Sequence, residues 1–331
     1  FFFFFFFPFF AGWDTHGLPV EIEVEKQLGM SGKQDIEKFG IKAFNEKCKE
    51  SVFTYESMWR KMTKRMGYLI DMDNPYITLD NDYIETLWWI IKEFFDAVMI
   101  YEGHKILPYC PRCGTGLASH EVAQGYKEVK AMTITAKFKR KNADEYFLAW
   151  TTTPWTLASN VSLTVGPDVD YVKVRMTAGE EEGSVFYVAK VLADKVLGAE
   201  NYQVIEEMKG KELEYMKVAH PFMNRESLVI YGDHVTLESG TGCVHTAPGH
   251  GVEDFEVCKN YPEIPIIVPV DSVGKLTEEA GEFAGLTTDE ANKAIAIKLE
   301  EIGALFALQK IIHQYPHCWR CKQPVLFRAT E

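Results

Sequence analysis

The chain has 331 residues, 47% of them hydrophobic and 25% charged, a balance that suits a globular protein with a sizeable core and two or three domains. The net charge of −13 argues against a protein that binds nucleic acid over its whole surface, but it does not exclude a local basic patch. No apolar segment of about 20 residues follows the N-terminal run, so we expect no membrane-spanning helix.

The N-terminal region contains little that predicts function. Residues 1–10, FFFFFFFPFF, lack the basic segment and cleavage site of a signal peptide, so we treat them as artefactual or unassigned sequence. Residues 12–19 then form a glycine-punctuated turn with Asp14, which can hold a substrate ammonium but more often caps a helix. Residues 20–25 alternate as a strand does, yet their acidic residues equally suit a first helical turn.

Two amphipathic helices are expected next. Apolar residues recur at steps of three and four over residues 40–66, and Gly67 is a plausible stop. A second helix is expected from Asp80 or Asn81 to Gly103. Its apolar face consists of Ile84, Leu87, Trp88, Ile91, Phe95 and Val98. We interpret both helices as scaffold rather than site.

Four of the seven cysteines form two Cys-x-x-Cys pairs, which indicates a reduced protein with metal rather than a disulfide framework. The four are Cys110, Cys113, Cys318 and Cys321. One tetrahedral Cys₄ zinc site requires the chain between the pairs to return to its starting point, and such a closed site is structural. The alternative is two sites, completed by His120 near the first pair and by His313 or His317 near the second.

The chain between the pairs is rich in short β-patterned runs, which predict a barrel-like or mixed α+β domain. These runs are residues 133–138, 146–152, 171–174, 185–188, 228–231 and 266–270. One helix is expected near the end of this region, because Thr287 and Glu290 make a capping box and Gly303 closes the apolar stripe.

A run of threonines around Pro154 is the first candidate site. Its members are Thr151, Thr152, Thr153, Trp155 and Thr156. Residues 146–150 are typical of a buried strand, and Pro154 cannot donate to a sheet ladder. We therefore expect the threonines where the strand gives way to a turn, a place that can present hydroxyls and backbone N–H groups to a ligand. The alternative is a threonine-rich strand without a ligand.

The second candidate site is residues 240–255, where four glycines and a proline surround two histidines and two acids. A helix is expected to start after Gly251, with Asp254 in its first turn. A carboxylate there can anchor a ligand ammonium or merely suit the helix dipole. His245 and Asp254, taken with the threonine run, favour a site.

Residues 12–19, 151–157 and 240–254, with both cysteine pairs, resemble the isoleucyl-tRNA synthetases. These are class I aminoacyl-tRNA synthetases with a hydrolytic editing domain inserted in a nucleotide-binding fold. Valyl and leucyl relatives usually carry Thr-Thr-Arg-Pro at the first editing stretch, whereas here Thr153 and Trp155 flank Pro154, as in the isoleucyl pattern. The resemblance covers residues 11–331.

The resemblance implies a fold class that combines α/β and α+β. Residues 11–127 would form part of a Rossmann-type synthetic domain with the first zinc knuckle. Residues 128–312 would form an inserted β-barrel-like editing domain, and residues 313–331 a return segment with the second knuckle. The HIGH and KMSKS signatures, which bind ATP in this family, are not found, so we expect a fragment that cannot activate isoleucine by itself. ATP would serve the full enzyme only, and zinc would be structural.

The resemblance also implies roles for single residues. Asp254 would bind the α-ammonium of misattached valine, and His245 would block the extra methyl of isoleucine. The threonines would line the pocket and bond the adenosine or an attacking water, with Trp155 as a wall. Gly242 and Gly251 would contact substrate. Asp14 matches the residue that holds the ammonium of isoleucine, and we expect no role for it in a fragment.

The implied partners are tRNA(Ile) and valine, isoleucine or their adenylates, in a cytoplasmic monomer that does not bind a membrane. No general base is obvious, so our working hypothesis is an oriented water. This interpretation requires the segments around Pro154 and Pro248 to meet across one cavity. Two other hypotheses are a zinc-stabilised tRNA-docking or structural module without hydrolytic activity, and a valyl-type editing site that removes threonine.

Overall fold

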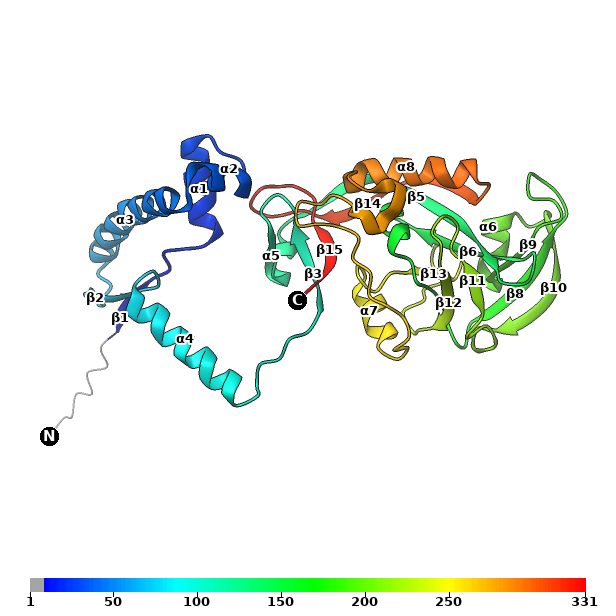
Figure 1. Ribbon diagram of the computed structural model, residues 1–331, viewed down its shortest axis with the longest axis horizontal. Helices are drawn as coiled ribbons and strands as arrows, with labels where there is room; N and C mark the ends of the chain where they lie inside the picture. Colours follow the sequence, from blue (N-terminus) through cyan, green and yellow to red (C-terminus); the bar gives the residue numbers. More distant parts are fainter. Residues whose placement is uncertain (1–8) are drawn as a thin grey trace. The chain divides into compact units, whose positions relative to one another are not determined.

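The computed structural model describes residues 9–331, which divide into two compact units (Figure 1). The smaller unit runs to Gly103 and includes Arg112–Gly114, and the larger unit holds His104–Pro111 and Thr115–Glu331. Within the described residues, no helix combines the length and the apolar character needed to cross a membrane.

The smaller unit consists of four helices and two parallel strands. They are β1 (Phe10–Trp13), α1 (Leu18–Leu28), α2 (Lys33–Phe39), α3 (Ile41–Met66), β2 (Asp71–Ile77) and α4 (Asn81–Asp96). The ambiguous residues 20–25 are helical, because Pro19 stands in the first turn of α1, where proline favours a helix. The helix over residues 40–66 is confirmed as α3, and Gly67 ends it with a φ of 72°.

The expected end of the second helix at Gly103 is wrong. Helix α4 begins at Asn81 as expected but ends at Asp96. Val98 adopts the left-handed region, with a φ of 57°, and the N–H of Met99 donates to the carbonyl of Phe94. This backbone closure usually involves glycine, so a β-branched residue gives no sequence signal for it. Val98, which we expected on the apolar face of this helix, therefore lies beyond the end of the helix.

The larger unit is organised around a ten-stranded mixed sheet in the order β10-β8-β9-β6-β13-β7-β12-β11-β5-β14. Strand β6 also pairs with β5, so β5, β6, β13, β7, β12 and β11 pair in a closed circuit. The strands are β5 (Tyr126–Arg140), β6 (Tyr146–Thr151), β7 (Ser162–Val165), β8 (Asp170–Met176), β9 (Val185–Ala189), β10 (Tyr202–Lys209), β11 (Lys217–Ala219), β12 (Glu226–Tyr231), β13 (Cys243–Thr246) and β14 (Leu305–Pro316).

All but one of the predicted strands are present, within β5, β6, β8, β9 and β12. The strand predicted over residues 266–270 is wrong, because only Val270 makes an isolated bridge there, to Leu276. Pro265 and Pro269 remove two ladder donors from that segment. The predicted borders at residues 128 and 312 fall inside β5 and β14, which pair along most of their length.

A smaller sheet of β15 (Leu326–Thr330), β3 (Lys105–Cys110) and β4 (Thr115–Gly116) lies in the same unit. Its helices are α5 (Ser119–Ala123), α6 (Ala193–Leu197), α7 (Val252–Cys258) and α8 (Thr288–Glu301), with 3-10 turns η1 (Pro154–Ser159), η2 (Lys190–Leu192), η3 (Gly210–Glu212) and η4 (Glu278–Phe283). The capping box of α8 is confirmed, since the N–H of Glu290 donates to the Thr287 hydroxyl at 3.3 Å.

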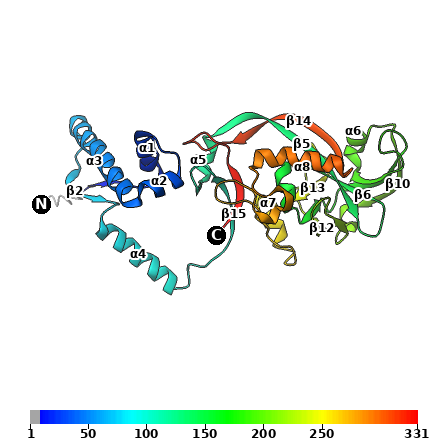
Figure 2. The same ribbon diagram turned by 45° about the horizontal axis from the view of Figure 1, so that its top comes forward.

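The core of the larger unit lies between the sheet and α8, which packs against η1, β5 and β14 (Figures 1 and 2). Leu157 of η1 and Leu299 of α8 are fully buried in it with Phe138 and Phe147 of the sheet. Apolar packing of Leu157 thus fixes η1, which directly follows Thr151, Thr152 and Thr153.

Candidate functional site

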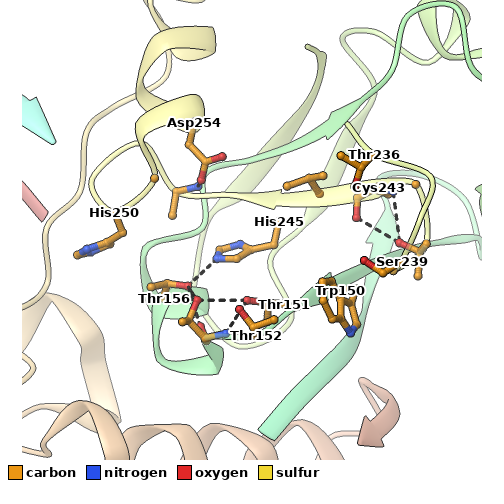
Figure 3. A pocket seen from close by; sticks show the side chains of 17 residues that line it. Trp150, Thr151, Thr152, Thr156, Thr236, Ser239, Cys243, His245, His250 and Asp254 are labelled. Carbon is orange, nitrogen blue, oxygen red and sulfur yellow. Dashed lines mark hydrogen bonds between the residues drawn. The ribbon is translucent and has the colours of Figure 1, made fainter. Parts of the chain in front are cut away.

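The threonine run and the glycine-rich segment line one cavity of about 270 Å³ (Figure 3). The predicted residues that line it are Thr151, Thr152, Thr153, Thr156, Gly242, His245, Gly251 and Asp254. Other lining residues include Trp150, Thr236, Ser239 and His250. The expectation that the segments around Pro154 and Pro248 meet across a common cavity is confirmed.

The threonines stand at the junction of β6 and η1, as Pro154 predicts. Thr151 is the last residue of β6, and its hydroxyl accepts a hydrogen bond from the N–H of Thr153 at 3.1 Å. The hydroxyl of Thr156 donates to the carbonyl of Thr153 at 2.7 Å. Strand β13 pairs with β6 at Val244 and Trp150, which sets His245 beside these hydroxyls.

His245 is buried and bonded at both ring nitrogens. The amide nitrogen of Asn160 lies 2.7 Å from Nδ1, and the Thr156 hydroxyl lies 3.0 Å from Nε2. Because an amide N–H can only donate, Nδ1 accepts and the ring proton is on Nε2. Burial lowers the pKa of His245 to about 3, and charges on His250 and Arg225 lower it further. His245 is therefore neutral and offers no lone pair to an attacking water.

Asn160, which the sequence did not single out, holds the His245 ring from behind the cavity lining. Its amide nitrogen also donates to the carbonyl of Ser162 at 2.8 Å, and its oxygen accepts from the Ser227 hydroxyl at 2.6 Å. These contacts fix which way the amide faces, and hence the tautomer of His245. The local pattern around Asn160 does not reveal this role, because its partners His245 and Ser227 lie far along the chain.

His220 and Arg225 hold the carbonyl groups of η1 and of the residue after it. The ring Nε2 of His220 donates to the carbonyl of Leu157 at 2.8 Å. Arg225 donates to the carbonyl of Asn160 at 2.8 Å and also to that of Ala158. These buried donors satisfy carbonyls that a short 3-10 turn leaves open. They fix the segment that presents Thr156 to the cavity and Asn160 to the His245 ring.

Asp254 lies in the first turn of α7, as expected, and its side chain is 15% exposed. Its Oδ2 accepts a hydrogen bond from the N–H of Ala247 at 2.8 Å. Burial raises the pKa of Asp254, because the charged form is disfavoured away from water; the N–H of Ala247 and the His234 ring, whose Nε2 lies 3.9 Å from Oδ1, only partly offset this effect. A Cβ at Gly251 would lie 2.6 Å from this oxygen, so the carboxylate fits only beside glycine.

Two predicted residues lie elsewhere. The structure does not place Trp155 in the wall of this cavity, because its indole is buried and packs edge-on against His250 at 4.7 Å. Its backbone N–H donates to the side-chain oxygen of Asn292 at 2.9 Å. Asp14 belongs to the smaller unit, where its side chain is 87% exposed and 3.7 Å from His16.

The four cysteines of the two pairs come together. The sulfur atoms of Cys110, Cys113, Cys318 and Cys321 all lie within 4.8 Å of one another. Sulfurs of a tetrahedral zinc site are about 3.8 Å apart, so this donor set fits Zn²⁺. No second group of three or more such ligands is found in residues 9–331, which favours one Cys₄ site over two sites completed by histidines.

The buried histidines predict a loss of stability in mild acid. Burial lowers the pKa of His220 and His245 to about 3 and that of His250 to about 4. Below a pH of about 6.5 the unfolded chain binds protons that the folded chain does not, so stability falls as pH falls. Between pH 7.5 and 5.5 the free energy of unfolding of the larger unit should fall by about 4 kcal/mol.

Denaturant titrations at the two pH values measure this difference. We expect His220→Gln to remove about a third of it, whereas His104→Gln, at an exposed position, should leave it unchanged. A difference below about 1 kcal/mol in the unchanged chain would contradict the burial of neutral imidazoles.

The cysteine cluster predicts one zinc ion per chain, because it supplies four thiolates and leaves no open position. Elemental analysis of purified protein should give one equivalent, and Cys318→Ser should lower both the zinc content and the thermal midpoint. Cys48→Ser is the matched control, since Cys48 lies outside the cluster. Two equivalents per chain, or full retention by Cys318→Ser, would exclude the single site.

Comparisons with known proteins agree on one family. The family model described as "tRNA synthetases class I (I, L, M and V)" matches residues 6–326. The chain is 48% identical over 328 residues to the isoleucine–tRNA ligase of Clostridium tetani (strain Massachusetts / E88), covering 97% of this chain and 31% of that protein. It is 49% identical over 322 residues to the isoleucine–tRNA ligase of Clostridium kluyveri, covering 96% of this chain and 30% of that protein.

The chain thus spans about a third of the length of these relatives. A solved structure, "The crystal structure of GlLeuRS-CP1", aligns with a TM-score of 0.43 and 15% identity over 54% of this chain and 99% of that chain, a likeness too weak to support an argument. The family match covers nearly the whole chain. This protein therefore belongs to the class I tRNA synthetases of the I, L, M and V group.

Proposed function

We propose that the larger unit hydrolyses the ester that links misattached valine to tRNA(Ile). The observation that carries this proposal is the shared cavity, where threonine hydroxyls, a neutral histidine and a buried carboxylate face one another. In the complete protein, a synthetic site would attach isoleucine to the same tRNA with ATP, and the zinc ion would be structural.

A second site is needed because valine and isoleucine differ by one methylene. A hydrophobic pocket distinguishes such substrates only about 10- to 200-fold, a limit for which isoleucyl enzymes are the usual example. A cavity that admits valine and excludes isoleucine can then remove the error by hydrolysis. The cavity of about 270 Å³, with His245 in its wall, is where we place such selection by size.

Asp254 supplies the contact for the amino acid. An ammonium group beside its carboxylate would stabilise the charged form that burial disfavours, through a charge-assisted hydrogen bond closer than the 3.9 Å contact with His234. His245, held at both ring nitrogens, cannot move aside for a larger side chain. We assign to it the exclusion of the extra methyl group of isoleucine.

The attacking water is oriented rather than deprotonated by a side chain. Both nitrogens of His245 are engaged, and the Asp254 carboxylate is assigned to the ammonium. The hydroxyls of Thr151, Thr152 and Thr153 remain to hold the water or the adenosine. Positioning alone can supply a large part of the acceleration of an ester hydrolysis.

Deacylation assays test the proposal. We expect the chain to hydrolyse Val-tRNA(Ile) and to leave Ile-tRNA(Ile) intact, while His245→Ala makes Ile-tRNA(Ile) labile. Thr-charged tRNA belongs in the same series. Preference for threonine over valine would indicate valyl-type editing. If no ester is hydrolysed, the result would favour the alternative of a tRNA-docking or structural module without hydrolytic activity. Full resistance of Ile-tRNA(Ile) in His245→Ala would contradict the steric role.

Asp254→Asn tests the ammonium contact without disturbing the fold. An asparagine oxygen can still accept from the N–H of Ala247, but the negative charge is lost. Loss of a charged hydrogen bond of about 1.5–3 kcal/mol should lower kcat/KM for valyl-adenosine about 10- to 150-fold. The thermal midpoint should not fall, because the neutral side chain avoids the cost of a buried charge.

Glu253→Gln is the control, since this exposed acid lies in the same helical turn but outside the cavity lining. It should hydrolyse valyl-adenosine at the unchanged rate. Equal losses in the two variants would show a general effect of charge on the helix rather than a contact with the ligand.

A further inference from the structure

A second cavity, of about 280 Å³, adjoins the first one. Thr152 and Thr153 line both cavities, so the threonine run forms a wall between them. The other sides come from β5, β14 and the first turn of α8, which lie together in Figure 1. Trp155, which was expected to line the first cavity, lines this one.

Three aromatic side chains at alternate positions of the chain face this cavity. They are His313, Tyr315 and His317, which we call the aromatic stripe. The ring centroids of His313 and Tyr315 are 5.8 Å apart, and those of Tyr315 and His317 are 6.2 Å apart. His313 and Tyr315 are at alternate positions of β14 and so point to one face of it, and His317 follows directly after the end of the strand. The stripe is therefore a continuous row of rings along the cavity.

Hydrogen bonds to backbone carbonyls fix two of the three rings of the stripe, Tyr315 and His317. The hydroxyl of Tyr315 donates to the carbonyl of Val325 at 2.9 Å, and Nδ1 of His317 donates to the carbonyl of Tyr315 at 2.9 Å. The side chains of His313 and Tyr315 are only partly buried, so ring surface stays accessible. A fixed aromatic surface loses little conformational entropy when a flat ligand stacks on it.

Asn292 adds hydrogen-bond donors to the same cavity. Its side-chain oxygen accepts from the backbone N–H of Trp155 at 2.9 Å, which directs the amide nitrogen away from that contact. Among residues 9–331 the structure gives no acceptor for this nitrogen, although Asn292 lines the cavity. Two N–H groups are thus free to recognise a ring nitrogen or carbonyl of a ligand.

A metal ion does not account for these histidines. Within the described part of the chain, the cysteine cluster is the sole group with the spacing of metal ligands, and His313 and His317 do not belong to such a group. Their rings instead flank Tyr315 edge-on. Aromatic and histidine rings in a row are the surface on which unpaired nucleobases stack.

We propose that the second cavity binds the unpaired nucleotide that precedes the esterified adenosine of the RNA substrate, with its base on the aromatic stripe. This inference rests on the proposed function, because an ester held beyond the threonine wall leaves the preceding nucleotide on the other side of Thr152 and Thr153. Stacking needs little positive charge, which suits a chain with a net charge of −13.

The test compares two ligands that differ only by the preceding nucleotides. One is adenosine carrying valine through a non-hydrolysable amide, and the other is the matching 3′-terminal trinucleotide. Stacking of one base should make the trinucleotide bind about 5- to 100-fold more tightly to the unchanged chain. Calorimetric titration of both ligands gives this ratio directly.

Variants of the stripe locate the effect. His313→Leu and Tyr315→Leu should bring the ratio to about one while leaving adenosine binding unchanged, and His313→Phe should restore it. The side chain of His313 is only partly buried and packs against the Tyr315 ring, so its substitution should be tolerated. Thermal midpoints of the three variants check that the fold persists.

Each outcome separates this inference from the proposed function. Tight adenosine binding with a ratio of one in the unchanged chain would overturn the nucleotide site and leave the editing proposal standing. A ratio that persists in both leucine variants would also overturn it. If neither ligand binds, both proposals fail together.

Discussion

The hydrogen bonds of His245 are the constraint on which the candidate site depends. They join β13 to η1, because Asn160 and Thr156 occupy the two ring nitrogens at 2.7 Å and 3.0 Å. A proton on Nδ1 would face the N–H of Asn160 and cost the desolvation of two buried donors. The neutral Nε2–H form is thus required by the fold, and it fixes one wall of the cavity against the other.

The rest of the site follows from satisfying other buried polar groups. His220 donates a hydrogen bond to a carbonyl of η1, and Arg225 donates to the carbonyl of the residue that follows it. The carboxylate of Asp254 accepts a hydrogen bond from the N–H of Ala247. Burial disfavours the ionised carboxylate of Asp254, which has the His234 ring 3.9 Å away, and the cavity opens beside it. A buried acid that faces an open cavity is placed to bind a cationic ligand.

The sequence predicted the site well where a residue type forces local structure. Pro154 marked the end of β6, Gly251 the start of α7, and Thr287 with Glu290 the start of α8. The prediction failed where contacts between residues far apart in the sequence determine the position of a side chain. Asn160, His220 and Arg225 act through partners far along the chain, and the Trp155 side chain lines the second cavity instead of the first. Val98 closes α4 without glycine, so its end was also missed.

The most direct measurement is the protonation of His245 in solution, from nitrogen-15 and proton shifts of histidine-labelled protein. We expect a neutral ring with the proton on Nε2 at pH 7, and no titration of this signal down to about pH 5, because burial lowers its pKa to about 3. Loss of the Asn160 amide, as in Asn160→Asp, should change this signal first. A ring that is charged at pH 6, or protonated on Nδ1, would contradict the account of how the cavity is held.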